Sequence, residues 1–227
     1  MMPAMRAAEA EGEPEGARVI AISERVLFDR HRRGDPAAFP ALVTAFRAPV
    51  FGYLTRCGVS PSDRDDLFQE VFLRVHRAGL PAQRLPVQGL PGQPEAEQAG
   101  PTGPFAPWLF TIAVNVVRSH FRKASVRGVF VLREDAAEST ASPDRGPEAA
   151  AEVRQDVSWV EGALARLPLE QREALVLCAV EGLELADAAV ALGVPVDTVK
   201  TRVRRARLAL AEAKARLSLR EEREAGR

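Results

Sequence analysis

The sequence predicts an all-α fold of two small helical domains joined by a flexible linker, the C-terminal one containing a helix-turn-helix. Ala, Leu, Glu and Arg are abundant, and aromatic residues make up only 6% of the 227 residues. This composition favours helices over a β-sandwich or a β-barrel. Apolar residues recur at intervals of three and four over most of the chain, which is the period of an α-helix.

Two stretches break the helical pattern and set the predicted domain boundaries. The first is rich in proline and glycine, and the second is rich in alanine, serine and acidic residues, so both are predicted to be non-helical connections. The predicted divisions are a disordered N-terminal extension (1–18), a helical domain (19–127) with a Pro/Gly-rich insertion (80–107), an acidic linker (128–152) and a helix-turn-helix domain (153–220).

In the N-terminal domain, a short leading helix is predicted over residues 19–33. The next helix is expected to start after Asp35-Pro36, with Asp35 as its N-cap. A further helix is predicted from Ser60 to Gly79 and the last from about Pro107 to Lys123. The last three of these helices each carry one apolar stripe.

In the C-terminal domain, an apolar stripe that includes Val160 predicts a first helix, which stops at Pro168. A second helix is expected from Glu170 to Glu181. A short helix, the break at Gly193-Val194-Pro195 and a long basic helix follow, and this order is typical of a helix-turn-helix. The apolar positions of the long helix step by four and three residues: Val199, Val203, Ala206, Leu210, Ala213 and Leu217.

The formal net charge is zero, but the charges are segregated along the chain. Residues 200–220 contain eight Lys or Arg and one acidic residue, whereas 134–161 contain eight acidic residues and two arginines. Thr201, Arg204 and Arg205 are predicted to lie on the face of the long helix opposite its apolar stripe. Arginine forks and a hydroxyl on such a helix can reach base edges and phosphates in a major groove, so the pattern indicates nucleic-acid binding.

Other functional classes lack their signatures. The two cysteines, Cys57 and Cys178, show neither a disulfide framework nor metal-ligand spacing, and His31, His76 and His120 are scattered and expected at the surface or at helix ends. No nucleotide-binding or hydrolase motif occurs, so we expect no enzyme, no cofactor and no metal. No long apolar run or signal peptide is found, which predicts a cytoplasmic protein without membrane insertion.

Four segments resemble bacterial sigma-70-type transcription initiation factors of the small extracytoplasmic-function group, and they follow one another in the order found in that family. Residues 63–75 read Asp-Arg-Asp-Asp-Leu-Phe-Gln-Glu-Val-Phe-Leu-Arg-Val, and 108–115 read Trp-Leu-Phe-Thr-Ile-Ala-Val-Asn, followed by Arg122-Lys123. Residues 167–173 and 193–202 are similar to the C-terminal region of the family. The insertion at 80–107 departs from the pattern, because it looks longer than the corresponding loop of the family and its tip, residues 100–104, lacks the polar and charged residues usually found there.

The resemblance implies partners and residue roles. Core RNA polymerase and promoter DNA are the expected partners, with an anti-sigma factor as a further candidate. Trp108 is a candidate for stacking on a base of the −10 element, but a Trp at helical spacing from Ile112 is more often a core residue. The implied sites are, for core polymerase, Asp66, Gln69, Glu70 and Leu73; for −10 DNA, Asn115, Arg118, Arg122 and Trp108; and for −35 DNA, Thr198, Lys200, Thr201, Arg204 and Arg205.

Two other functions remain open at this point. The chain could be a stand-alone helix-turn-helix regulator, or an interaction module that has lost DNA binding. The stretch from Arg127 to Glu152 reaches at most ~80 Å when extended, and two promoter elements about two helical turns apart are separated by ~70 Å. The linker is therefore long enough for both domains to contact one promoter.

Overall fold

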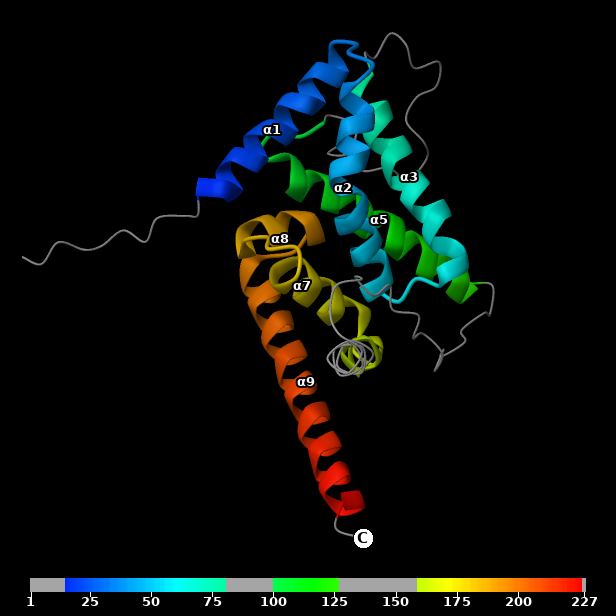
Figure 1. Cartoon of the computed structure of the whole chain (residues 1–227), viewed down its shortest axis with the longest axis vertical. Helices are drawn as coiled ribbons and strands as arrows, with labels where there is room; N and C mark the ends of the chain where they lie inside the picture. The colour runs from blue at the N-terminus through cyan, green and yellow to red at the C-terminus, as the bar shows by residue number, and fades with distance from the viewer. Residues whose placement is uncertain (1–14, 81–99, 127–158, 226–227) are drawn as a thin grey trace, which may run out of the picture.

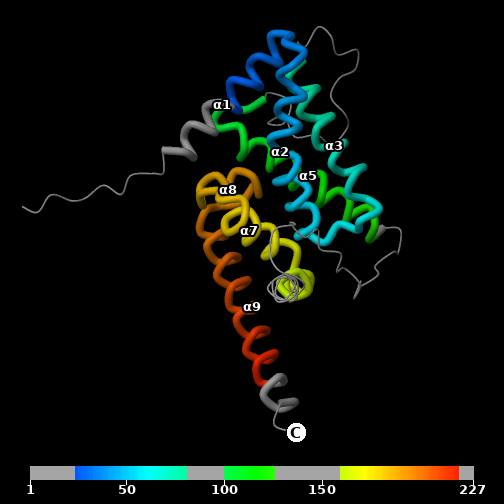
Figure 2. Tube along the Cα trace, in the orientation of Figure 1, coloured from blue at the N-terminus to red at the C-terminus, as the bar shows by residue number. Residues whose placement is uncertain are grey.

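The computed structural model describes residues 15–80, 100–126 and 159–225, and all regular secondary structure in these ranges is helical (Figure 1). The described helices form an N-terminal unit and a C-terminal unit, and the chain trace in Figure 2 shows the two lying against each other. The disordered extension predicted before residue 19 lies largely outside the described ranges. So do most of the insertion at 80–107 and the whole of the linker at 128–152.

The N-terminal unit consists of α1 (Glu15–Arg32), α2 (Ala38–Arg56), α3 (Pro61–Gly79) and α5 (Phe105–Val126). The predicted helices are thus all present, with α1 and α5 extending further than expected. Asp35 does not cap α2 directly, because the N-cap position is Ala37; its carboxylate accepts a hydrogen bond from the Ala37 backbone N–H at 2.9 Å.

Aromatic rings fill the end of the N-terminal unit where α1 crosses α5. The Trp108 ring centroid lies 5.2 Å from that of Phe28 and 5.6 Å from that of Phe105, and Phe105 also contacts Phe46. Trp108 is only 8% exposed. Its place in this core corrects the assignment of Trp108 to base stacking, because a base could reach the ring only if the core opened.

His31 and His76 lie in the last turns of α1 and α3, as predicted for helix ends, but their rings contact each other. The end of α1 packs on the end of α3, which buries His31 and places its ring 4.9 Å from that of His76 and 5.0 Å from that of Phe39. Gly79 permits this approach, since a Cβ there would lie 2.4 Å from the His31 ring. The sequence missed the pair because tertiary packing alone brings the ends of α1 and α3 together.

The C-terminal unit consists of a helical segment at 159–165, α7 (Leu169–Ala179), α8 (Leu185–Leu192) and α9 (Val196–Ala225). Gly193 ends α8 with a φ of 66°, in the left-handed region that glycine adopts without a Cβ penalty. This turn lets α9 begin at a steep angle to α8, and the predicted helix-turn-helix is confirmed.

The apolar stripe of α9 is buried only along its first turns. Val199, Val203 and Ala206 are buried, whereas Leu210 and Leu217 are half-exposed because α9 runs past the body of the unit (Figure 1). Val160, which the sequence assigned to an inward stripe, is 40% exposed. None of the described helices combines the length and the hydropathy needed to cross a bilayer.

The two units pack directly on each other, which the sequence did not predict. α5 lies along α8, and α2 contacts α7. The buried apolar residues of both units form one continuous cluster. α8 buries Ala188, Ala189, Ala191 and Leu192, because it lies between α5 on one side and the other helices of its own unit. The tethered pair therefore forms one compact body.

Candidate functional site

The first turns of α9 present a basic face to solvent. Thr201, Arg204 and Arg205 are exposed, while Val199 and Val203 on the opposite face are buried against the unit. The Thr201 hydroxyl donates a hydrogen bond to the backbone carbonyl of residue 197 at 2.8 Å. The helix-turn-helix thus fixes which side of α9 is available to a ligand.

The remaining two predicted duplex contacts border this face. Lys200 is exposed and pairs with Asp197 at 3.2 Å on the helix surface, an interaction that water and salt weaken. Thr198 is half-buried. Arg204 and Arg205 are therefore the side chains best placed to reach base edges, since guanidinium forks match the acceptors of guanine in the major groove.

A second candidate surface lies on α3 and combines acidic, amide and apolar side chains. Asp66 and Gln69 are exposed, and Leu73 is 48% exposed. Glu70 accepts a hydrogen bond from Arg74 at 2.9 Å, so part of its charge is already balanced. An exposed leucine beside carboxylates is suited to a partner helix with basic and apolar side chains.

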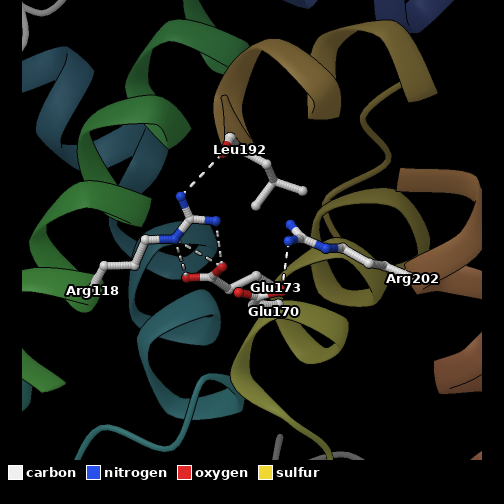
Figure 3. A network of polar contacts seen from close by, with 5 residues as sticks. All are labelled: Arg118, Glu170, Glu173, Leu192 and Arg202. Atoms are coloured by element: carbon white, nitrogen blue, oxygen red, sulfur yellow. Dashed lines mark hydrogen bonds and ion pairs between the residues drawn. The ribbon is translucent and has the colours of Figure 1, made fainter. Parts of the chain in front are cut away.

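The predicted −10 residues on α5 do not share one environment. Arg122 is exposed and donates to the Ser119 hydroxyl at 3.2 Å, and Asn115 is half-buried. Arg118 points instead towards the C-terminal unit (Figure 3). The structure therefore leaves Arg122 accessible, whereas Arg118 is directed towards the C-terminal unit and its side chain is 32% exposed.

Arg118 is held by two different acceptors of the C-terminal unit. Its Nη2 donates to Glu173 Oε2 at 2.8 Å, and its Nε lies 3.1 and 3.2 Å from the two carboxylate oxygens. Its Nη1 donates to the Leu192 carbonyl at 3.0 Å, at the C-terminal end of α8 (Figure 3). Burial raises the pKa of the fully buried Glu173, and the Arg118 guanidinium opposes that rise.

Arg172 makes a second polar contact between the units. Its Nη1 donates to the Cys57 carbonyl at the end of α2, at 2.8 Å, and its Nη2 donates to two carbonyls of its own unit. Gly58 makes room for this contact, because a Cβ there would lie 2.5 Å from Arg172 Nη1. Arg172 therefore bonds backbone acceptors of both units.

Sequence reasoning missed Arg172 and Glu173, although a signal was present. The two residues lie one helical turn before Val176 and Leu177, which are buried, so the inward face of α7 runs directly onto them. A charged pair on a buried face must find partners, because an unpaired buried charge is costly. The apolar run from Ala174 to Val180 that follows them could thus have indicated that both residues need partners, although not which ones.

Glu181 makes a third polar contact between the units, and the charge of its carboxylate depends on pH. Its carboxylate lies 3.7 Å from Arg56 Nη1 of α2, too far for a hydrogen bond, and its side chain is 7% exposed. Burial raises its pKa from 4.5 to about 7. At neutral pH the folded chain is therefore about half protonated at Glu181, whereas the unfolded chain has already lost this proton.

We expect Glu181→Gln to stabilise the protein above pH 7. The stabilisation from the raised pKa is complete below pH 4.5 and is lost as the pH rises to about 7. The variant should consequently exceed the parent by up to about 3 kcal/mol at pH 8 and match it at pH 4.5. Urea unfolding at both pH values measures this difference, with the exposed Glu212→Gln as the control. An equal difference at both pH values would contradict it.

Known proteins match most of the length of this chain in sequence. The family model "Sigma-70, region 4" matches residues 158–210. The ECF RNA polymerase sigma factor SigC of Mycobacterium tuberculosis is 33% identical over 181 residues, which cover 78% of this chain and 84% of that protein. SigM of the same species is 30% identical over 191 residues, or 83% of each chain. CnrH of Cupriavidus metallidurans is 28% identical over 193 residues, covering 83% and 92%.

Two solved structures share the fold. The structure of CnrH in complex with the cytosolic domain of CnrY covers 84% of this chain and 96% of that chain, with a TM-score of 0.55 and 24% identity. RpoE of Bartonella quintana, in complex with the anti-sigma factor NepR, covers 78% and 96% with a TM-score of 0.56 and 24% identity. The likeness extends over both helical units.

Proposed function

The chain belongs to the extracytoplasmic-function (ECF) group of RNA polymerase sigma factors, and on this premise we propose how its surfaces divide the work of initiation. The α3 surface binds core RNA polymerase. The α9 face binds the −35 duplex, and α5 contacts the melted −10 strand. The protein contributes no catalytic group of its own, since the polymerase carries out the chemistry, and it acts in the cytoplasm where that enzyme works.

The exposed basic face of α9 is the observation that carries this proposal. Arg204 and Arg205 lie on the leading turns of the second helix of a helix-turn-helix, which is the part that enters the major groove in this motif. The buried stripe on the other side of α9 holds these residues outward. Their positions support direct contact with base edges rather than a structural role.

The −10 contact rests on α5. Arg122 is exposed near the end of the helix, and Asn115 lies on the same helix two turns earlier. A guanidinium and an amide on one helix can bind the phosphates and the base edges of a single strand. Trp108 is left out of this proposal, because it belongs to the core.

An anti-sigma factor is a further proposed partner. The solved structure of the Bartonella quintana relative contains the anti-sigma factor NepR. This chain shares its fold over both units, so we propose that a protein of this class covers surfaces on them. Purification of the chain from its own cells, followed by identification of a stoichiometric partner, tests this part separately.

Run-off transcription with purified core RNA polymerase tests the function itself. The chain should co-purify with core enzyme and produce discrete transcripts from fragments of its own genome, whereas core enzyme alone should not. Binding to duplex DNA without core enzyme, together with no transcript, would instead indicate a stand-alone regulator. Absence of both core binding and initiation would overturn the proposal.

Arg204→Ala is expected to weaken recognition at one −35 base pair. Loss of the bidentate contact between an arginine guanidinium and a base edge costs about 1–3 kcal/mol of binding free energy. The variant should bind as the parent does on templates that are already changed at that base pair. Run-off transcription from a series of single-base −35 variants measures it. Arg216→Ala, at an exposed site further along α9, is the matched control. A uniform loss on all templates would make Arg204 a phosphate contact.

A further inference from the structure

We propose that Asp197 and Lys200, at the start of α9, together recognise a single C·G base pair in the −35 duplex. This inference rests on the proposed function and deepens it, because it names the base pair that the first turn of α9 selects. Asp197 is the new element, since a carboxylate adds a preference that the basic residues of the same face do not supply.

Asp197 lies in the middle of the exposed basic face of α9. At about 100° per residue, it stands about 20° around the helix from Arg204 and about 40° from Thr201. The buried residues Val199 and Val203 lie on the opposite side. The Asp197 side chain is 91% exposed. An acidic side chain therefore stands where the duplex would approach, although the phosphates of DNA repel a carboxylate.

The carboxylate of Asp197 is paired with the ammonium group of Lys200 on the same face. Its Oδ1 accepts a hydrogen bond from Lys200 Nζ at 3.2 Å. The Lys200 side chain is 57% exposed, so both partners are open to a ligand. A carboxylate has several acceptor sites and an ammonium group has three donors, so each keeps capacity for a further hydrogen bond. The ion pair thus presents an acceptor beside a donor, without a net charge that would repel the phosphates.

A C·G base pair offers the complementary pattern in the major groove. Cytosine N4 is a donor there, and guanine O6 is an acceptor. The two atoms are hydrogen bonded to each other within the base pair, so they lie about 2.9 Å apart. This separation is close to the 3.2 Å between Asp197 Oδ1 and Lys200 Nζ. The carboxylate can therefore accept from cytosine N4 while the ammonium group donates to guanine O6.

The other base pairs fit these two side chains less well. In the reversed pair, G·C, an acceptor faces the carboxylate and a donor faces the ammonium group, so both contacts become unfavourable. An A·T pair has a donor and an acceptor in the required order, but adenine N7 adds an acceptor beside the carboxylate, and the thymine methyl group lies beside O4. A C·G pair instead adds guanine N7 as a second acceptor for Lys200.

Helix stabilisation is the competing role for Asp197. An acidic residue in the first turn interacts favourably with the positive end of the helix dipole. If this were its whole role, its loss would weaken α9 and lower binding to every promoter sequence by the same factor. Recognition of a base pair instead predicts a change at one position of the −35 element, so a base-by-base measurement separates the two roles.

A second exposed ion pair of α9 supplies the matched control. Glu212 and Arg216 lie 3.3 Å apart, and their side chains are 67% and 78% exposed. This pair has the same chemistry but lies about four turns further along the helix, outside the leading turns that enter the major groove. Asp197→Asn and Glu212→Gln each replace a carboxylate with an amide, so the two variants have equal formal charge.

Transcription by the full chain with core RNA polymerase measures the base preference. The template is a transcribed promoter with its −35 region randomised, and each template carries a barcode in its transcribed part. The parent should favour C·G over G·C at one position by about fivefold or more. Asp197→Asn should move the preference at that position to A·T, because an amide donates to adenine N7 and accepts from adenine N6. Lys200→Ala should reduce the C·G preference at the same position.

Glu212→Gln should reproduce the parental preference at every position. If Asp197→Asn also keeps the parental preference, or lowers transcription from all templates equally, the inference is overturned and Asp197 only stabilises the helix. In that case the proposed function stands, because the parent still initiates transcription. Absence of transcripts from the parent with core enzyme would instead overturn the proposed function, and the inference with it.

Discussion

Replacing Leu73 with aspartate is expected to lower the affinity for core RNA polymerase by about 30-fold to 1,000-fold. Leu73 is the exposed apolar side chain of the proposed docking surface on α3, and loss of a well-packed interface anchor costs about 2–4 kcal/mol. Because the side chain is 48% exposed, the substitution should leave the fold nearly unchanged. Transcript yield should fall together with binding at sub-saturating concentrations.

Val26→Asp is the matched control for this prediction. Val26 is 47% exposed, so the same apolar-to-acidic change is made on a helix outside the docking surface. Fluorescence anisotropy titrations of each labelled variant with core enzyme give the two dissociation constants. If Leu73→Asp and Val26→Asp bind equally well, α3 is not the docking surface, even though the family resemblance assigns it there.

Replacing Trp108 with alanine is expected to destabilise the N-terminal unit by about 3–5 kcal/mol. The indole packs against Phe28 and Phe105, and its removal would leave a large cavity that these rings cannot fill. This cost is a large share of the 5–15 kcal/mol that usually stabilises a folded protein. Trp108→Phe should cost less, because it keeps a ring at the same position.

Urea unfolding followed by circular dichroism measures both variants without relying on tryptophan fluorescence. The order of stability should be parent, then Trp108→Phe, then Trp108→Ala. A Trp108→Ala protein that is as stable as the parent but loses binding to the −10 strand would reverse the correction. It would restore Trp108 to the stacking role implied by the resemblance.

Much of the fold could be predicted because its helices are strongly periodic. α3 has the predicted bounds within one residue, and the first half of the α9 stripe, from Val199 to Ala206, is buried as its four- and three-residue steps require. The left-handed Gly193 and the following proline likewise located the turn of the helix-turn-helix. These features depend on the order of residues within one or two elements, so sequence reasoning reaches them.

The residue roles were less predictable because they depend on neighbours distant in sequence. Arg118 and Arg122 are one turn apart on α5, yet one is bound by the C-terminal unit and the other is exposed. The Arg118–Glu173 pair joins residues 55 positions apart, and the Arg172–Cys57 contact joins residues 115 apart. No local period signals such pairs.

The sequence by itself determined the helical class, the helix-turn-helix, the outward basic face of α9 and the resemblance to sigma factors. Each of these follows from local backbone preferences and from the burial of one stripe per helix. The tertiary structure alone decided which rings Trp108 packs against, that His31 meets His76, and that the two units close on each other through Arg118. Those outcomes depend on which surfaces meet, and a buried charge or ring is fixed by the partners that reach it.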